Sequence, residues 1–218
     1  MGEPLWQSVI WTPKYEKKFP SEGLWGSAVI AQNLKLERYE PDETFPWLRE
    51  LRGSTAIAKS KGSPRWFASV HVTPRPIPDD LRSSMWPKDL PVSTRNNTTW
   101  GTDVIPYELN KLFAGTSFVW GGDLNSAESM DDKPSFAGGN RLVRKVWEEG
   151  GSYDLRKAIH AEEQRTYFVE GRGPYQLDHV FGDKRTLKRV KSWKVNPRPA
   201  TAIQPYSDHA PILVEIGD

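Results

Sequence analysis

The chain has 218 residues, which is enough for one domain with a hydrophobic core and too few for two domains of ordinary size. Its 37% apolar and 27% charged residues and its mean hydropathy of −0.66 are typical of a globular protein, and its apolar runs fall far short of the roughly 20 residues of a membrane helix. The absence of cysteine excludes disulfides, thiolate metal sites and cysteine nucleophiles, and a net charge of +2 indicates little about an anionic partner. The amino terminus lacks the pattern of a secretory signal, so a cytoplasmic location is expected.

The predicted elements are mainly short strands, because 18 Pro and 17 Gly interrupt the apolar segments. Two helices are expected, one over 104–112 and one over 142–147 that stops at Gly150 and Gly151. Between strand and first helix, residues 74–97 contain five Pro and no sustained period, which predicts a long surface loop. The mixture predicts a single α/β or α+β domain over residues 1–218. The seven expected strands lie at 25–31, 55–58, 66–72, 117–120, 176–181, 190–195 and 211–216.

The first polar cluster that could carry chemistry is Gly121–Asn125, which directly follows the apolar run Phe118–Trp120. Its two glycines permit a tight turn, and Asp123 and Asn125 stand two positions apart, so their side chains can point the same way. An acid beside an amide offers a base or a cation ligand next to a neutral hydrogen-bond donor. Both residue types are also common turn caps, and that reading stays open for the motif by itself.

Two further clusters bring acids next to histidines. Asp208 and His209 stand directly before the last expected strand, where Asp208 could hold a metal and His209 could act on a substrate, or where both could simply form a turn. Asp178 and His179 occupy opposite faces of another expected strand. An Asp placed against a His fixes the tautomer of the ring and supports its positive charge. His71 lies on the strand at 66–72, where a lone histidine is more often a packing residue than a catalyst.

Together these segments resemble the motifs of the endonuclease/exonuclease/phosphatase superfamily, which includes DNase I-like nucleases, abasic-site endonucleases, sphingomyelinases and inositol polyphosphate phosphatases. Each motif is weak singly, whereas four in the family's order are specific, and the similarity spans about 25–216. The resemblance implies a four-layer α/β/β/α sandwich and metal-dependent hydrolysis of phosphoric esters. Nucleic acid is the favoured substrate, ahead of a phospholipid head group or an inositol phosphate. The motifs are SVHV at 69–72, WGGDLN at 120–125, LDHVF at 177–181 and SDHAPI at 207–212.

The resemblance also implies a catalytic role for five of the matched residues. Asp123 would bind or deprotonate the attacking water, and Asn125 would stabilise charge on the phosphoryl oxygens. His209 would contact the scissile phosphate as an acid or a base, and Asp178 would orient it. His71 would be a further histidine at the phosphate or the leaving group.

The implied metal site would use Asp208 and Asp123, and such hard oxygen ligands favour Mg²⁺ or Mn²⁺ over zinc. The family pattern also has two earlier strands, the first ending in an Asn and the second in a Gln-Glu pair whose Glu is the principal metal ligand; neither is found. Glu3 is the only acid near that place, and no apolar strand precedes it. We therefore expect an N-terminally incomplete domain with apolar surface exposed on neighbouring strands. A truncated or mis-started reading frame, or a short form that is inactive or completed by a partner chain, would explain it.

A basic run follows the strand at 176–181, and Trp193 is interleaved with it. The run could follow a nucleic-acid backbone while Trp193 stacks on a base. The favoured reading is the solvated face of a strand whose apolar residues, Trp193 among them, point to the core, because charge runs are usually solvated faces. The same ambiguity extends to function, because a module that binds phosphate or nucleic acid without turnover is the alternative to a hydrolase. The basic residues are Lys184, Arg185, Lys188, Arg189, Lys191, Lys194 and Arg198.

Overall fold

A six-stranded mixed sheet forms the centre of the molecule in the computed structural model, which describes residues 8–13, 26–51, 53–74, 76–77, 79, 99–133, 139–196 and 207–217. The two central strands, β5 and β6, run parallel, and every other neighbouring pair is antiparallel. In spatial order the strands are β3 (Leu36–Tyr39), β4 (Thr55–Ser60), β5 (Arg65–His71), β6 (Ser117–Asp123), β8 (Asp178–Gly182) and β7 (Tyr153–Asp154).

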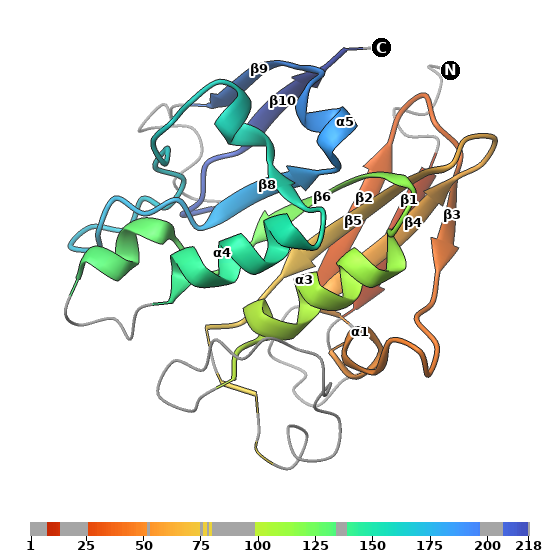
Figure 1. Ribbon diagram of the computed structural model, residues 1–218, viewed down its shortest axis with the longest axis horizontal. Coiled ribbons are helices and arrows are strands. Elements are labelled where there is room, and N and C mark those ends of the chain that lie inside the picture. Colours follow the sequence, from red (N-terminus) through yellow and green to blue (C-terminus); the bar gives the residue numbers. More distant parts are fainter. Residues whose placement is uncertain are drawn as a thin grey trace.

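Helices cover one face of this sheet (Figure 1). Their apolar faces pack on it through a cluster of aromatic rings in which Trp120 stacks on Phe181 at 4.3 Å and Trp147 meets Phe181 edge-on at 5.5 Å. All three rings are almost completely buried, so this face holds the main hydrophobic core. The helices are α1 (Pro46–Glu50), α3 (Gly101–Leu112) and α4 (Asn140–Glu149), with a short α5 (Lys184–Leu187) and the 3₁₀ helices η1 (Glu128–Asp132) and η2 (Leu155–Ala158).

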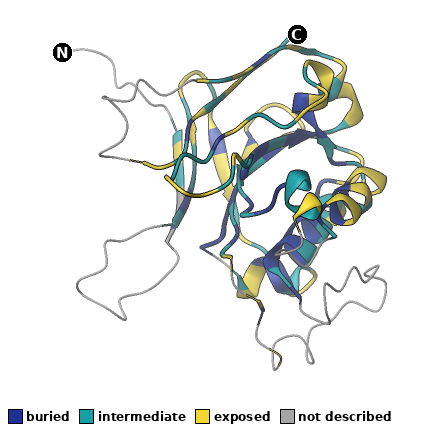
Figure 2. Cartoon of the chain, turned by 90° about the vertical axis from the view of Figure 1, so that its left-hand side faces the viewer, coloured by how far each residue is buried: buried dark blue, intermediate teal, exposed yellow. Residues whose placement is uncertain are grey.

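The opposite face carries two separate two-stranded sheets (Figure 2). β1 (Ser8–Pro13) pairs with β2 (Gly26–Ala31), which packs on β4 and β5, and β9 (Val190–Val195) pairs with β10 (Ile212–Ile216), which packs on β8. On this side, the side chains of central-strand residues such as Val119 are only half-buried. The sandwich is therefore packed less tightly over β5 and β6 than on its helical side.

The predicted mixed α+β class is confirmed, and the seven predicted strands and two predicted helices all appear within a few residues of their expected bounds. The described residues form three layers of the expected four-layer sandwich. Strands β3 and β7 and the short helices α1 and α5 were not predicted, because each is too short or too polar to show a period. Strand β1 was also not predicted, although it contains the apolar run Val9–Trp11. The predicted loop at 74–97 and Glu3 lie almost wholly or wholly outside the described residues. None of the described helices has both the length and the apolar character needed to cross a bilayer.

Candidate active site

Three strands of the central sheet bring a polar residue to the same edge. His71 ends β5, Asp123 ends β6 and Asp178 begins β8. The strand register places them in one row, since the Cα partner of Asp123 is His71 on one side and Asp178 on the other. Side chains at paired positions of neighbouring strands lie on the same face, so all three project from the face opposite the helices. Residues that are 52 and 55 positions apart in the chain therefore meet through backbone pairing alone.

The two glycines before Asp123 let the neighbouring strands approach closely. Gly122 has φ 143°, and a Cβ there would lie 1.9 Å from the carbonyl oxygen of Val70. A Cβ at Gly121 would lie 2.5 Å from the carbonyl oxygen of His179. Residues with side chains cannot occupy either position without moving the backbone. The Gly-Gly pair is thus required by the pairing that aligns the site.

Asn125 holds Asp123 in place through a compact turn. The Asn125 backbone N–H donates to Asp123 Oδ1 at 2.8 Å, and its side-chain Nδ2 donates to Asp123 Oδ2 at 2.9 Å and to the Val72 carbonyl at 2.8 Å. The turn requires φ 48° at Asn125, a left-handed conformation that Asn tolerates better than most residues. Asn125 therefore orients the Asp123 carboxylate as well as standing beside it.

The environment of Asp123 changes its acidity. Burial is the main cause that raises its pKa to about 6, and the nearby charge of Asp178 acts in the same direction. The hydrogen bonds from Asn125 and the proximity of His209 oppose this shift. A carboxylate with a pKa of about 6 can accept a proton near neutral pH and release it again.

Asp178 and His209 form a short hydrogen bond, with Asp178 Oδ2 2.6 Å from His209 Nδ1. This bond is the main cause that raises the pKa of His209. Because a carboxylate can only accept, the bond also means that Nδ1 carries a proton. The other ring nitrogen, Nε2, lies 4.0 Å from Asp123 Oδ2 and 3.9 Å from Asp208 Oδ1. On the other side, His71 Nε2 lies 3.6 Å from Asp123 Oδ2. The structure thus brings all six residues of the predicted catalytic and metal sites to one place.

Two residues of the site carried no signal in the sequence. The Tyr167 ring lies 5.2 Å from the His209 ring at an interplanar angle of 58°, and the two residues form a β-bridge. Thr166 is completely buried, and its Oγ1 accepts hydrogen bonds from the backbone N–H groups of Leu177 and Asp178. Both belong to a segment without regular secondary structure or a recognisable motif, so only the folded chain reveals their position.

Asp123, Asp178 and His209 form a group that could hold a cation, since one ligand atom from each lies within 4.8 Å of the others. Two neighbouring carboxylates repel each other, and a cation would relieve the repulsion that helps to raise the pKa of Asp123. Carboxylate oxygens suit Mg²⁺ or Mn²⁺. Asp208, a predicted ligand, stands next to this group with its side chain 56% exposed, and is not one of its three members.

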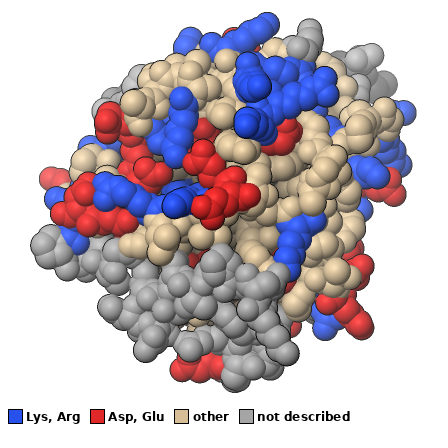
Figure 3. Space-filling view, in the orientation of Figure 1, with Lys and Arg blue, Asp and Glu red and all other residues tan. Residues whose placement is uncertain are grey.

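The predicted nucleic-acid residues lie away from this site. Asp183 caps α5 and also accepts a hydrogen bond from the Phe118 N–H at the start of β6, so α5 is at the opposite end of β6 from Asp123. Basic side chains gather around α5 and β9 on the face seen in Figure 3. Trp193 is only 2% exposed, so the favoured reading of this strand, with its apolar residues toward the core and its cations in solvent, is confirmed. The alternative, in which Trp193 stacks on a base, is wrong.

The comparisons with known proteins give the fold a name. No model of a protein family and no curated protein matches the chain. Solved structures do match, among them the 3′ phosphatase NExo from Neisseria bound to a product DNA hairpin, at a TM-score of 0.64 and 15% identity over 95% of this chain and 87% of that one. An AP endonuclease from Archaeoglobus fulgidus matches at a TM-score of 0.63 and 18% identity, over 95% of this chain and 78% of that one. The AP endonuclease LMAP from Leishmania major matches at a TM-score of 0.57 and 16% identity, over 88% of this chain and 66% of that one.

These neighbours are nucleases and phosphatases with the DNase I-like fold, the fold that the four sequence motifs imply. The chain therefore has the DNase I-like fold. Identities of 15 to 18% establish the architecture alone, so the chemistry of this chain has to be argued from its own residues.

Proposed function

We propose that the protein is a metal-dependent hydrolase of phosphodiester bonds that acts on nucleic acid. The observation that carries this proposal is the row of His71, Asp123 and Asp178, closed by His209 from the second layer. On this face of the sheet, the carboxylates of Asp123 and Asp178 lie next to each other, and Asp178 orients the ring of His209. In-line displacement at phosphorus requires such an arrangement, with one group to activate water and others to stabilise charge on the phosphoryl oxygens.

In this mechanism Asp123 takes the proton of the attacking water. Its pKa of about 6 matches proton transfer near neutral pH better than that of an ordinary aspartate. Asn125 keeps the carboxylate in position, through its hydrogen bonds to both carboxylate oxygens. The proton therefore leaves the nucleophile toward a base that is already oriented before the substrate arrives.

His209 stabilises the phosphate from the opposite side. The Asp178 carboxylate accepts the Nδ1–H bond and raises the pKa of His209, so that Nε2 carries a proton over a wider pH range. The Nε2–H group can then donate to a non-bridging oxygen as negative charge builds on it. His71, whose Nε2 lies 3.6 Å from Asp123 Oδ2, would contact the same phosphate.

The residues present fit a hard divalent cation, which Asp123 would hold with Asp178 or Asp208. When bound, such an ion neutralises phosphate charge and lowers the pKa of a coordinated water. Loss of turnover on chelation, and its recovery with Mg²⁺ or Mn²⁺, is the result expected.

Nucleic acid as the substrate rests on two observations. The neighbour NExo was solved with a product DNA hairpin. In this chain, exposed basic side chains surround α5 and β9, and no described carboxylate forms an ion pair with them. These side chains are Lys184, Arg185, Lys188, Lys191 and Lys194.

The decisive test is hydrolysis of bis(p-nitrophenyl) phosphate, a small activated phosphodiester, with and without Mg²⁺ or Mn²⁺. His209→Ala should abolish metal-dependent turnover. His160→Ala is the matched control, because the His160 ring lies 3.3 Å from the Trp193 carbonyl and outside the site, and it should keep activity. A folded protein that binds phosphate without turnover would instead support the non-catalytic alternative.

Substrate class is tested separately by the salt dependence of single-stranded DNA binding. Changing Lys184, Arg185 and Lys188 to Gln should reduce the slope of log K against log salt by about 2, at about 0.7 per lost phosphate contact. The matched control changes three exposed basic residues outside α5 and β9, one in α1, one directly before β3 and one directly after β4, and should leave the slope unchanged. An equal effect in both variants would reject α5 as a specific contact. The control residues are Arg49, Lys35 and Lys61.

A further inference from the structure

His179 is buried on the helical side of the sheet, behind the site. It follows Asp178 in β8, so the two side chains point to opposite faces, and only 1% of His179 is exposed. Its Nδ1 lies 3.1 Å from Gln176 Nε2, and its Nε2 lies 2.9 Å from the carbonyl oxygen of Ser126. The ring therefore connects β8 to the residue that directly follows Asn125.

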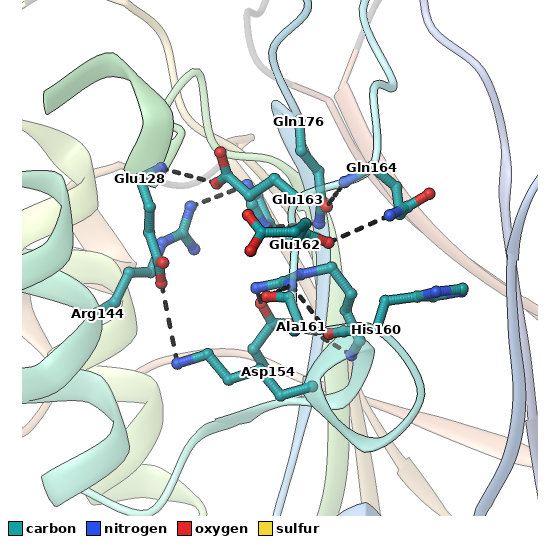
Figure 4. A network of polar contacts seen from close by, with 12 residues as sticks. Glu128, Arg144, Asp154, His160, Ala161, Glu162, Glu163, Gln164 and Gln176 are labelled. Atoms are coloured by element: carbon teal, nitrogen blue, oxygen red, sulfur yellow. Dashed lines mark hydrogen bonds and ion pairs between the residues drawn. The ribbon is translucent and has the colours of Figure 1, made fainter. Parts of the chain in front are cut away.

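The hydrogen bonds around His179 determine which nitrogen carries the proton. The Gln164 backbone N–H donates to Gln176 Oε1 at 2.7 Å (Figure 4). This bond leaves the amide nitrogen of Gln176 to donate to His179 Nδ1. A neutral ring that accepts at Nδ1 has its proton on Nε2, and this proton points to Ser126.

Arg144 of α4 binds the same carbonyl oxygen. Its Nη2 donates to Ser126 O at 2.8 Å. Nη2 also lies 2.8 Å from His179 Nε2, and with the His179 proton on Nε2 this is a close contact between two donors that share the Ser126 oxygen, not a hydrogen bond. Its guanidinium group lies over the rings of Trp147 and Phe181 at 4.6 and 5.4 Å. The Ser126 hydroxyl meanwhile donates to Asn140 Oδ1 at 2.6 Å. Ser126 is thus held at its carbonyl by two donors and at its side chain by a third residue.

This restraint bears directly on Asn125. The left-handed φ of 48° at Asn125 is unfavourable for a residue with a side chain and persists only where the surroundings impose it. The Ser126 carbonyl belongs to the peptide unit that follows Ser126, so the bonds to this carbonyl and to the Ser126 side chain fix the residue directly after Asn125. The bonds from Asn125 to Asp123 fix the preceding side of the turn. Release of the carbonyl would let Asn125 relax and would move its amide groups away from the Asp123 carboxylate.

We propose that His179 is a positioning residue that holds the Asp123–Asn125 turn in its active geometry through the Ser126 carbonyl, assisted by Arg144. The consecutive residues Asp178 and His179 of β8 would then act on opposite faces of the sheet. Asp178 would orient His209 on the face of the site, and His179 would orient Asn125 from the helical face. This inference rests on the proposed function for its effect on rate, but its structural part does not need turnover.

Two substitutions separate the role from simple core packing. His179→Gln places an amide nitrogen near the position of Nε2 and can still donate to Ser126 O, whereas His179→Asn reaches only as far as Nδ1. Both remove the ring and keep a polar amide in the core. We expect His179→Asn to lower kcat by about 10- to 100-fold with little change in KM, the scale of a misplaced catalytic group. His179→Gln should keep kcat within about threefold of the wild type.

A readout without turnover keeps this inference independent of the proposed function. The exchange rate of the Asn125 amide, whose proton is bonded to Asp123 Oδ1, is measured by NMR in both variants and in Phe113→Leu. Phe113 is a completely buried core residue that packs on Trp66 and Phe118, so this control should be less stable but unaltered at Asn125. Faster exchange at Asn125 in His179→Asn alone supports the proposal even if the wild type shows no hydrolysis. Equal exchange and equal kcat in the Gln and Asn variants, or the same change in Phe113→Leu, would overturn it.

Discussion

Replacing Asp123 with Asn should stabilise the metal-free protein at neutral pH while it removes hydrolysis. The pKa of Asp123 is about 6 in the folded chain against an ordinary value of 3.8, so its ionised form disfavours folding by about 3 kcal/mol at pH 7. Because the folded-state pKa is the higher one, this penalty is absent below about pH 4, where both states bind the proton, and grows as the pH rises to about 6. An asparagine side chain at this position cannot ionise and has no such penalty.

The substitution also has a cost, because an Asn amide cannot accept at both positions that Asn125 donates to. One lost hydrogen bond is worth about 1 kcal/mol. The variant should therefore be about 1 kcal/mol less stable than the wild type at pH 4 and about 2 kcal/mol more stable at pH 7. Urea unfolding of both proteins between pH 4 and 7 in the presence of a chelator measures the difference, in which titrations common to both cancel. A difference that does not change with pH would refute the assignment of a raised pKa to Asp123.

Three further substitutions have outcomes that the structure specifies. Asp178→Asn removes the charge that raises the pKa of His209, so the high-pH limb of the rate profile should move to lower pH and kcat should fall less than in His209→Ala; an unmoved limb would mean that His209 does not act in its protonated form. Gly122→Ala would place a Cβ 1.9 Å from the Val70 carbonyl oxygen and should lower the free energy of unfolding by several kcal/mol, measured by thermal unfolding. A melting curve like that of the wild type would contradict this strand pairing. Asp183→Ala removes the cap of α5 and should lower the free energy of unfolding by about 1 to 2 kcal/mol without changing kcat, whereas a large drop in kcat would show that α5 contributes to the site.

Much of the fold could be predicted because its strands are short apolar segments with clear breaks. The Gly121-Gly122 pair stands out in the sequence, and the structure explains it: β6 approaches its neighbours so closely that neither position has room for a side chain. The alternation along β8 also predicted that Asp178 and His179 face opposite sides. Strand β3, with only Leu36 buried, offers no such pattern.

What the sequence could not supply is the pairing of distant polar residues. Glu108 lies in α3 and accepts hydrogen bonds from the backbone N–H groups of Trp47 and Leu48 at the start of α1, an arrangement that only tertiary packing creates. Arg144 would be predicted on an exposed helix face from its charge, yet it is 5% exposed. Trp193 was predictable, because the alternation along its strand favours a core-facing ring among solvated cations, and the register of β9 with β10 buries it.

The site joins two layers, and this decides which part of it is most sensitive to change. His71, Asp123 and Asp178 belong to one sheet, where strand pairing fixes their spacing. His209 comes from the segment before β10, and its position depends on contacts between layers. One contact is the hydrogen bond between His209 Nδ1 and the Asp178 carboxylate. The others are backbone hydrogen bonds to the neighbouring segment, from Ala210 N to Thr166 O at 2.8 Å and from Phe168 N to Asp208 O at 2.9 Å. Substitutions at 166–168 should therefore alter the contribution of His209 before they alter Asp123, although that segment bears no catalytic motif.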